Sequence, residues 1–190
     1  MANVDRPNGA RVIGTIDGSP VNMHTRKRPV DSSNATAIFQ GDFIILEDDG
    51  NVAPYTGSSG GNLLGVCVGV VVSRTVAATE HPGYLPASTA GNILVAEGPD
   101  LLFEIQEDDG GTALTSAAIG SNADVLSTAG STTTGQSAHE LDRSTITDAS
   151  AATAQLRLIQ LVEAEDNAHG DWAKWIVRIN EHVHNEATGL

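Results

Sequence analysis

The sequence contains little cysteine and few aromatic residues. Cys67 is the only cysteine among 190 residues, which excludes an internal disulfide framework. Three Phe, two Trp and two Tyr give an aromatic content of 4%, whereas Gly, Ala, Ser and Thr are abundant. This composition is more typical of a β-protein with tight turns and polar loops than of a helical bundle.

Long apolar runs are also absent. No stretch approaches the roughly 20 apolar residues of a transmembrane helix, and the first thirty residues hold no apolar signal-peptide core. We therefore expect neither a membrane span nor a secretory signal. A chain of 190 residues is expected to form one domain, or one domain with an arm. A chain of this length buries roughly 70% of the surface that its unfolded form exposes, so the fold needs no disulfide cross-links for stability.

Basic residues are few and unevenly placed. The chain has ten Lys and Arg residues and 24 Asp and Glu residues, which gives a net charge of −14. Residues 1–30 hold five of the ten basic side chains against two acidic ones, a charge of +3, which leaves −17 for residues 31–190. The five are Arg6, Arg11, Arg26, Lys27 and Arg28. The strongly acidic segment 31–190 argues against a nucleic-acid partner, because phosphate contacts need clustered Lys and Arg.

A basic segment on an acidic body suggests docking onto an acidic protein surface or a neighbouring copy, with these five residues as the contacts. The simpler alternative is that the acidity serves solubility and that the segment is a loose terminus. Three prolines within residues 1–30 disfavour helix, because proline removes a backbone donor and restricts the residue before it. We therefore divide the chain into an extended N-terminal arm, residues 1–30, with a short strand at 11–16, and a β-body, residues 31–190.

Residues 92–111 carry the clearest strand pattern. Leu101, Phe103 and Ile105 alternate with Glu104 and Gln106. We expect strands at 93–96 and 101–107, joined at 97–100 as a half-buried antiparallel hairpin, because period-two alternation between Gly, Pro and Asp is typical of one. The second strand ends in Glu-Asp-Asp-Gly at 107–110, as does the segment Phe-Ile-Ile-Leu before residues 47–50.

Other segments also have strand patterns. The run at 63–73 is apolar without alternation, which indicates burial on both faces, and Gly65 and Gly69 permit sharp bends or close backbone approach. Apolar parity changes within 154–162, which predicts a bulge or two-sided burial. Further strands are expected at 37–46 (interrupted at 41–42), 52–55, 123–126 and 174–183.

The connections complete the expected fold. Residues 112–120 suit one helical turn, capped by Thr112 or Thr115 and stopped by Gly120. Residues 127–137 form a Ser/Thr/Gly-rich loop with too little apolar surface to order itself. We predict a mainly β fold, an antiparallel β-barrel or β-sandwich with an extended N-terminal arm and at most one or two short helical turns.

Two patterns suggest chemistry, and each has a simpler interpretation. Gly57–Gly61 fits the G-x-S-x-G motif of hydrolases, but no buried strand precedes it and no helix follows, so a flexible loop is expected. His182 and His184 share a strand face, and His169 and Asp171 are further candidate ligands for zinc or iron. Spacing fixes no third ligand, so a polar or interface face explains these side chains equally well.

The two Glu-Asp-Asp-Gly turns are candidates for calcium, yet they lack the alternating acids and distal Glu of an EF-hand loop. Asp and Gly are also what tight turns require. Cys67 lies inside an apolar run and is expected to be a small buried hydrophobe. We predict no catalytic residue, no cofactor site and no metal site, and hence no enzyme.

Four segments carry a family resemblance: MANVDRPNGARVIGTIDGSP, PVDSSNATAIFQGDFIIL, YLPASTAGNILVAEGPDLLFEIQEDDGG and WIVRINEHVH. Together they resemble small virion proteins of tailed bacteriophages that are assigned as head decoration, or cement, proteins. The resemblance implies a β-barrel or β-sandwich at capsid lattice points, commonly a trimer or dimer. It implies the major capsid protein and further copies of the chain as partners. It also implies synthesis in the host cytoplasm and a place on the outer surface of the virion. The alternatives are a tail or receptor-binding component and a cupin-like metal-binding enzyme.

Overall fold

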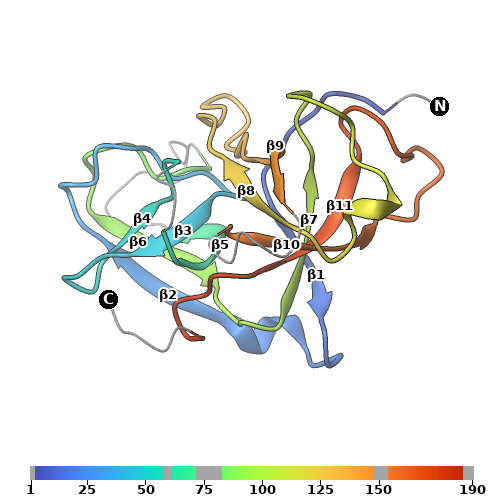
Figure 1. Cartoon of the computed structure of the whole chain (residues 1–190). Helices are drawn as coiled ribbons and strands as arrows, with labels where there is room; N and C mark the ends of the chain where they lie inside the picture. The colour runs from blue at the N-terminus through green and yellow to red at the C-terminus, as the bar shows by residue number, and fades with distance from the viewer. Residues whose placement is uncertain (1–2, 58–60, 72–82, 148–153, 186–190) are drawn as a thin grey trace.

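A computed structural model describes residues 3–57, 61–71, 83–147 and 154–185. Strands dominate these residues, and they form two antiparallel sheets packed as a sandwich (Figure 1). The two short helical turns are 3₁₀ helices, η1 at Val21–His24 and η2 at Ser116–Ala118. Neither helix has the length and apolar character needed to cross a membrane. The prediction of a mainly β fold is confirmed, and of its two alternatives the structure has the sandwich.

Sheet A has six strands in the order β1-β7-β11-β10-β8-β9. Its strands are β1 Arg11–Thr15, β7 Leu101–Gln106, β8 Asn122–Leu126, β9 Glu140–Thr147, β10 Leu156–Leu161 and β11 Lys174–Ile179. The parity change predicted a bulge or two-sided burial in β10, and the structure has the first, because the pairing of β10 with β11 shifts register between Leu158 and Gln160.

Sheet B has five strands in the order β2-β6-β5-β3-β4. Its strands are β2 Thr25–Val30, β3 Phe43–Leu46, β4 Val52–Pro54, β5 Leu63–Val71 and β6 Gly91–Ala96. A Cβ on Gly65 of β5 would lie 2.0 Å from the carbonyl oxygen of Ala96, so glycine is needed there for the close approach of β5 to β6.

The predicted hairpin at 92–111 is wrong, although both of its strands exist. β6 pairs with β2 and β5 in sheet B, whereas β7 pairs with β1 and β11 in sheet A. The turn between them therefore carries the chain from one sheet to the other. Alternation reports which face of a strand is buried, but it does not identify the neighbouring strand.

The N-terminal segment lies against both sheets (Figure 1). β1 pairs with β7 at one edge of sheet A, and β2 pairs with β6 at one edge of sheet B. The strand expected at 11–16 is confirmed as β1. Removal of residues 1–30 would therefore take an edge strand from each sheet.

The larger core lies between the sheets. The rings of Phe43 on β3 and Phe103 on β7 meet edge to face with centroids 6.2 Å apart, and Trp175 beside them is fully buried. Burial of an apolar side chain of this size contributes about 1.5–3 kcal/mol. A smaller core covers the other face of sheet B and includes Leu64 and Cys67. The first half of β5 is thus buried on both faces, as its unbroken apolar run predicted.

Sheet A curls, so its edge strand β9 reaches the end of β7. A bridge joins Glu107, the residue after β7, to Leu141 of β9. The N–H of Asp108 donates to the carbonyl oxygen of Leu141 at 3.1 Å. This curl brings a buried residue of β9, Arg143, beside the acidic turn that follows β7.

Candidate functional site

The five predicted contact residues separate into two groups. Arg11 lies on β1 at the edge of sheet A and the backbone N–H of Arg6 donates to the Gln106 side chain of β7, whereas Arg26, Lys27 and Arg28 lie on β2 at the edge of sheet B. Most of these charges already have internal partners. Arg6 and Lys27 are exposed and form no ion pair within the described part of the chain.

Glu97, in the turn between the sheets, binds two of the five. Arg28 donates from Nε and a terminal nitrogen to the two carboxylate oxygens of Glu97, at 2.7 and 2.8 Å. Arg26 also approaches Glu97 at 3.0 Å, but its side chain is 72% exposed. Glu97 itself is 4% exposed. The bidentate Arg28 pair therefore neutralises a buried carboxylate, and its first role is to stabilise the sheet crossing.

Arg11 belongs to a different surface, the outward face of sheet A. It binds Glu104 of β7 at 2.8 Å, with 69% of the Arg11 side chain exposed. Arg157 of β10 and Lys174 and Arg178 of β11 point outward as well, because they alternate with residues of the core. We call Arg11, Arg157, Lys174 and Arg178 the basic face.

The basic face concentrates positive charge in an acidic molecule. On β1, β7, β10 and β11 its four cations lie with one outward acid, Glu104, a net charge of +3 against −14 for the chain. Further acids surround these strands: Asp124 and Asp142 lie on β8 and β9, and Asp5 and Glu140 both accept from the Gln106 side chain at the end of β7. Partly exposed Leu102, Ile176 and Ile13 lie among the charges. The result is a sheet surface of mixed basic and apolar character.

Two arginines of the basic face are direct cross-strand neighbours. Arg157 pairs in register with Arg178 across β10 and β11. Like charges directly opposite each other destabilise a sheet. Neither arginine forms an ion pair with any residue that the structure describes. Arg157 donates to the Asn122 side chain at 3.2 Å, whereas Nε of Arg178 is buried without a partner among the described residues. An anionic group from outside the chain would relieve this repulsion.

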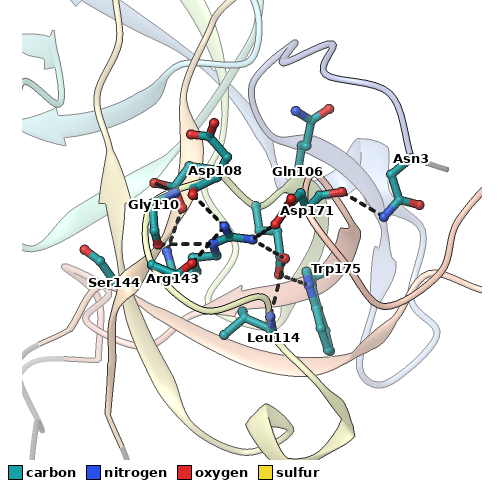
Figure 2. Close-up of polar contacts among 12 residues, drawn as sticks. Asn3, Gln106, Asp108, Gly110, Leu114, Arg143, Ser144, Asp171 and Trp175 are labelled. Atoms are coloured by element: carbon teal, nitrogen blue, oxygen red, sulfur yellow. Dashed lines mark hydrogen bonds and ion pairs between the residues drawn. The ribbon is translucent and has the colours of Figure 1, made fainter.

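The acidic turn at 107–110 is built around a guanidinium from its own chain (Figure 2). Arg143 donates to the carbonyl oxygens of residues 109–111 at 2.5, 3.1 and 3.1 Å. It also approaches the carboxylates of Glu107 at 3.4 Å and Asp171 at 2.7 Å. Its side chain is 2% exposed. Arg143 therefore provides the positive charge that a bound cation would bring to this turn.

Glu107 is the innermost acid of this turn. Its two oxygens accept from Nε1 of Trp175 at 2.7 Å and from the N–H of Leu114 at 3.4 Å. Burial raises the pKa of Glu107 to about 7, against the opposing effects of these hydrogen bonds and Arg143. Asp108 accepts from the N–H groups of Gly110 and Arg143. Because protein donors occupy these oxygens, the turn does not offer calcium an open set of ligands.

The histidine-based metal site is not assembled. His182 is fully buried and His184 is exposed, with ring centroids 5.3 Å apart. His169 instead packs near Trp175, and Asp171 binds Arg143. Within the described ranges, no group of three His, Cys, Asp or Glu side chains is arranged to hold a metal ion.

Cys67 is fully buried, and burial raises the pKa of its thiol to about 12. This agrees with the prediction that Cys67 is a small buried apolar residue. The serine motif at 57–61 falls largely outside the described residues.

Besides the Arg143 network, sequence reasoning missed two groups of residues. Arg157, Lys174 and Arg178 had no sequence signal as a group, because strand pairing brings them together. Their outward direction followed from alternation, so a correct strand order would have revealed the basic face. The other group is the buried pair Asp42 and His139, whose 3.6 Å approach joins two distant loops.

Comparison with known proteins adds no assignment. No protein-family model matches the chain, and no curated protein matches it significantly.

Proposed function

We propose that this chain is a capsid decoration protein, a virion structural protein that binds the outer surface of a tailed-phage head and stabilises it. The observation that carries the proposal is the basic face, in which Arg157 and Arg178 form no ion pair within the described residues and lie among partly exposed apolar side chains. The sequence resemblance names the partner as the major capsid protein, with the chain acting as a dimer or trimer. The β-sandwich is a compatible architecture.

Charge gives the molecule a preferred orientation. A face of net +3 is attracted to an acidic surface, while the acidic remainder is repelled by it. On docking, the cross-strand neighbours Arg157 and Arg178 gain an anionic partner, which they lack within the described chain. The apolar side chains between them add burial on docking.

Binding of this kind stabilises a shell through mass action. A protein that binds the assembled lattice better than the free subunits adds its binding free energy to the stability of the shell. Individually weak contacts suffice, because an oligomer that touches several capsid subunits gains effective concentration. Passive binding therefore accounts for the function without a catalytic step.

The structure revises how the N-terminal residues contribute to this proposal. Arg11 belongs to the basic face, and exposed Arg6 and Lys27 remain predicted contacts. Arg28 is held by Glu97, and Arg26 shares that partner. The main docking charges are therefore expected on β10 and β11.

The test is occupancy on purified heads that lack the protein. Arg157→Gln with Arg178→Gln removes two charges while keeping most of the side-chain volume. We expect at least about a tenfold loss of affinity and a weaker dependence of binding on salt, because surface charge attraction is screened.

A matched control changes the net charge equally at the other sheet. Ala87→Glu with Ala90→Glu adds two negative charges at exposed positions before β6. We expect this variant to bind heads nearly as the unaltered protein does. Equal occupancy by all three proteins would overturn the proposal, and binding to host cells but not to heads would favour a receptor-binding component.

A further inference from the structure

A hollow of about 440 Å³ lies where three loops meet. Its walls come from residues 36–42, from residues 54–56 at the end of β4, and from residues 127–132, with His139 beside them. This volume falls within the range of small-molecule sites. The hollow shares no residue with the basic face, so what it binds is independent of capsid docking.

The loop at 127–137 is held in place by its neighbours, contrary to the sequence expectation. Gln40 donates its N–H to Gly135 and accepts from the N–H of Ser137, at 3.2 and 2.9 Å. A Cβ on Gly130 would lie 2.5 Å from the ring of Phe39, so glycine allows the loop to pass directly over that ring. Contacts with Phe39 and Gln40 thus order a loop whose own composition favours disorder. The hollow is therefore preformed.

Asp42 and His139 form a buried polar pair in the wall. They are 2% and 4% exposed. Oδ2 of Asp42 accepts from the N–H of Phe39 at 2.7 Å. Oδ1 of Asp42 has no hydrogen-bond partner in the part of the chain that the structure describes, and Nε2 of His139 lies 3.6 Å from it. An unsatisfied carboxylate oxygen in such a position is costly.

The hydrogen bonding of His139 fixes its tautomer. The N–H of Phe43 donates to Nδ1 of His139 at 3.2 Å, so the proton of the neutral ring resides on Nε2. Burial lowers the pKa of His139 to about 4, so the ring is neutral at pH 7. Burial also raises the pKa of Asp42 to about 6, against the lowering effects of the Phe39 N–H and the Ser137 hydroxyl, so its carboxyl is mostly ionised at pH 7. The pair therefore places one acceptor beside one donor.

This arrangement selects among ligand classes. A metal ion needs a lone pair on Nε2, which carries the proton. An ammonium group suits Asp42 but would face the N–H of His139. A hydroxyl group both donates and accepts, so it can satisfy the two side chains together. The rest of the lining offers further hydroxyl groups, from Thr36, Thr56, Ser127, Thr128 and Thr132, and the aromatic side chains of Phe39 and Tyr55.

We propose that this hollow binds a neutral hydroxyl-bearing ligand of the size of a monosaccharide, with Asp42 and His139 as the polar anchors. Side chains that both donate and accept match a polyol, and the aromatic side chains of Phe39 and Tyr55 add apolar lining beside its C–H groups. A ligand this small binds weakly, so a Kd on the order of millimolar is expected.

The test is a titration of the full chain, followed by amide NMR shifts, with methyl glucoside, methyl galactoside and methyl mannoside. At least one sugar should shift the amides of residues 36–42 and 127–139 in a saturable way. Propylammonium and acetamide serve as comparison probes for a cation and an amide. Saturable binding of none of the three glycosides, or tighter binding of either comparison probe, would overturn the proposal.

Two variants locate the site. Asp42→Asn keeps the shape but replaces one acceptor oxygen by a donor, and we expect about a tenfold or greater loss of affinity. Ala129→Phe fills the hollow from an exposed wall position and leaves the anchors in place. It should abolish binding, and it decides the question if Asp42→Asn fails to fold. Unchanged sugar binding in Ala129→Phe would count against this location.

Discussion

Two segments of similar sequence end in the same four letters, yet their turns have opposite environments. Phe43 begins β3 in one sheet, Phe103 lies within β7 in the other, and their rings meet in the core. Glu-Asp-Asp-Gly at 47–50 then turns β3 into β4 at the surface, where residues 48–50 are exposed. Glu-Asp-Asp-Gly at 107–110 instead encloses Arg143, and Glu107 is fully buried.

The difference lies in what each turn meets. In the first turn Asp49 accepts from the backbone and side-chain nitrogens of Asn51, two residues on, at 2.9 and 2.7 Å. In the second turn the carboxylates and carbonyls bind a side chain 36 residues beyond Glu107. The first turn is therefore locally determined, whereas the second depends on the curl of sheet A. The residues Glu-Asp-Asp-Gly determine the local backbone turn, but the tertiary structure determines the environment of that turn.

The largest expected difference comes from removing the cation. Arg143→Met leaves Glu107 buried without its ion pair and leaves the carbonyls of 109–111 without donors. Breaking one side of a buried ion pair costs about 3–5 kcal/mol. Asp49→Asn in the first turn should change the free energy of unfolding by less than about 0.5 kcal/mol. Urea denaturation of both variants measures the contrast, and similar small losses would contradict it.

The second-largest difference in unfolding free energy is expected at the last glycine of each turn, Gly50 and Gly110. Gly50 has φ of +85° and open space around it, so Gly50→Ala costs about 1 kcal/mol through backbone strain alone. A Cβ on Gly110 would lie 2.5 Å from Oδ2 of Asp108. Gly110→Ala therefore displaces Asp108 from two backbone donors, which costs about 1–3 kcal/mol at 0.5–1.5 kcal/mol per hydrogen bond. Thermal unfolding of both variants ranks them, and a larger loss for Gly50→Ala would reverse this account.

The comparison also explains where sequence reasoning succeeded. Burial on both faces of β5, the bulge in β10 and the cap of η2 by Thr115 followed from local pattern. The pairing of β6 with β2 could not be predicted in this way, because Thr25–Val30 carries three cations and a proline instead of an apolar alternation.

β9 was missed for a related reason. Its buried positions among the described residues are Leu141 and Arg143, so a buried cation interrupts the apolar pattern. The Arg143 network was therefore invisible in the sequence, although its acidic half was recognised as a turn. The basic face escaped detection because its four cations are scattered from residue 11 to residue 178 and join only through strand pairing.

The smallest expected difference is in pH dependence. Burial raises the pKa of Glu107 from 4.5 to about 7, so folding favours its protonated form. Its contribution to stability is fully present below pH 4.5 and is lost as the pH rises through 7. The pKa of Glu47 is raised too, through slight burial and repulsion by Asp31 and Asp49, but this acid lies near the surface.

Glutamine variants at the two positions isolate these titrations. Glu107→Gln should be destabilising at pH 4.5, and the loss relative to the unaltered chain should shrink by about 1 kcal/mol or more by pH 8. Glu47→Gln should show a change several times smaller. Asp42 and Glu140, whose raised pKa values act in the same direction, and His139 and His182, whose lowered values act oppositely, titrate alike in all three proteins and cancel. Unfolding free energies at pH 4.5 and 8 measure the effect. A loss for Glu107→Gln that grows with pH would mean that the Arg143 ion pair outweighs burial at this acid.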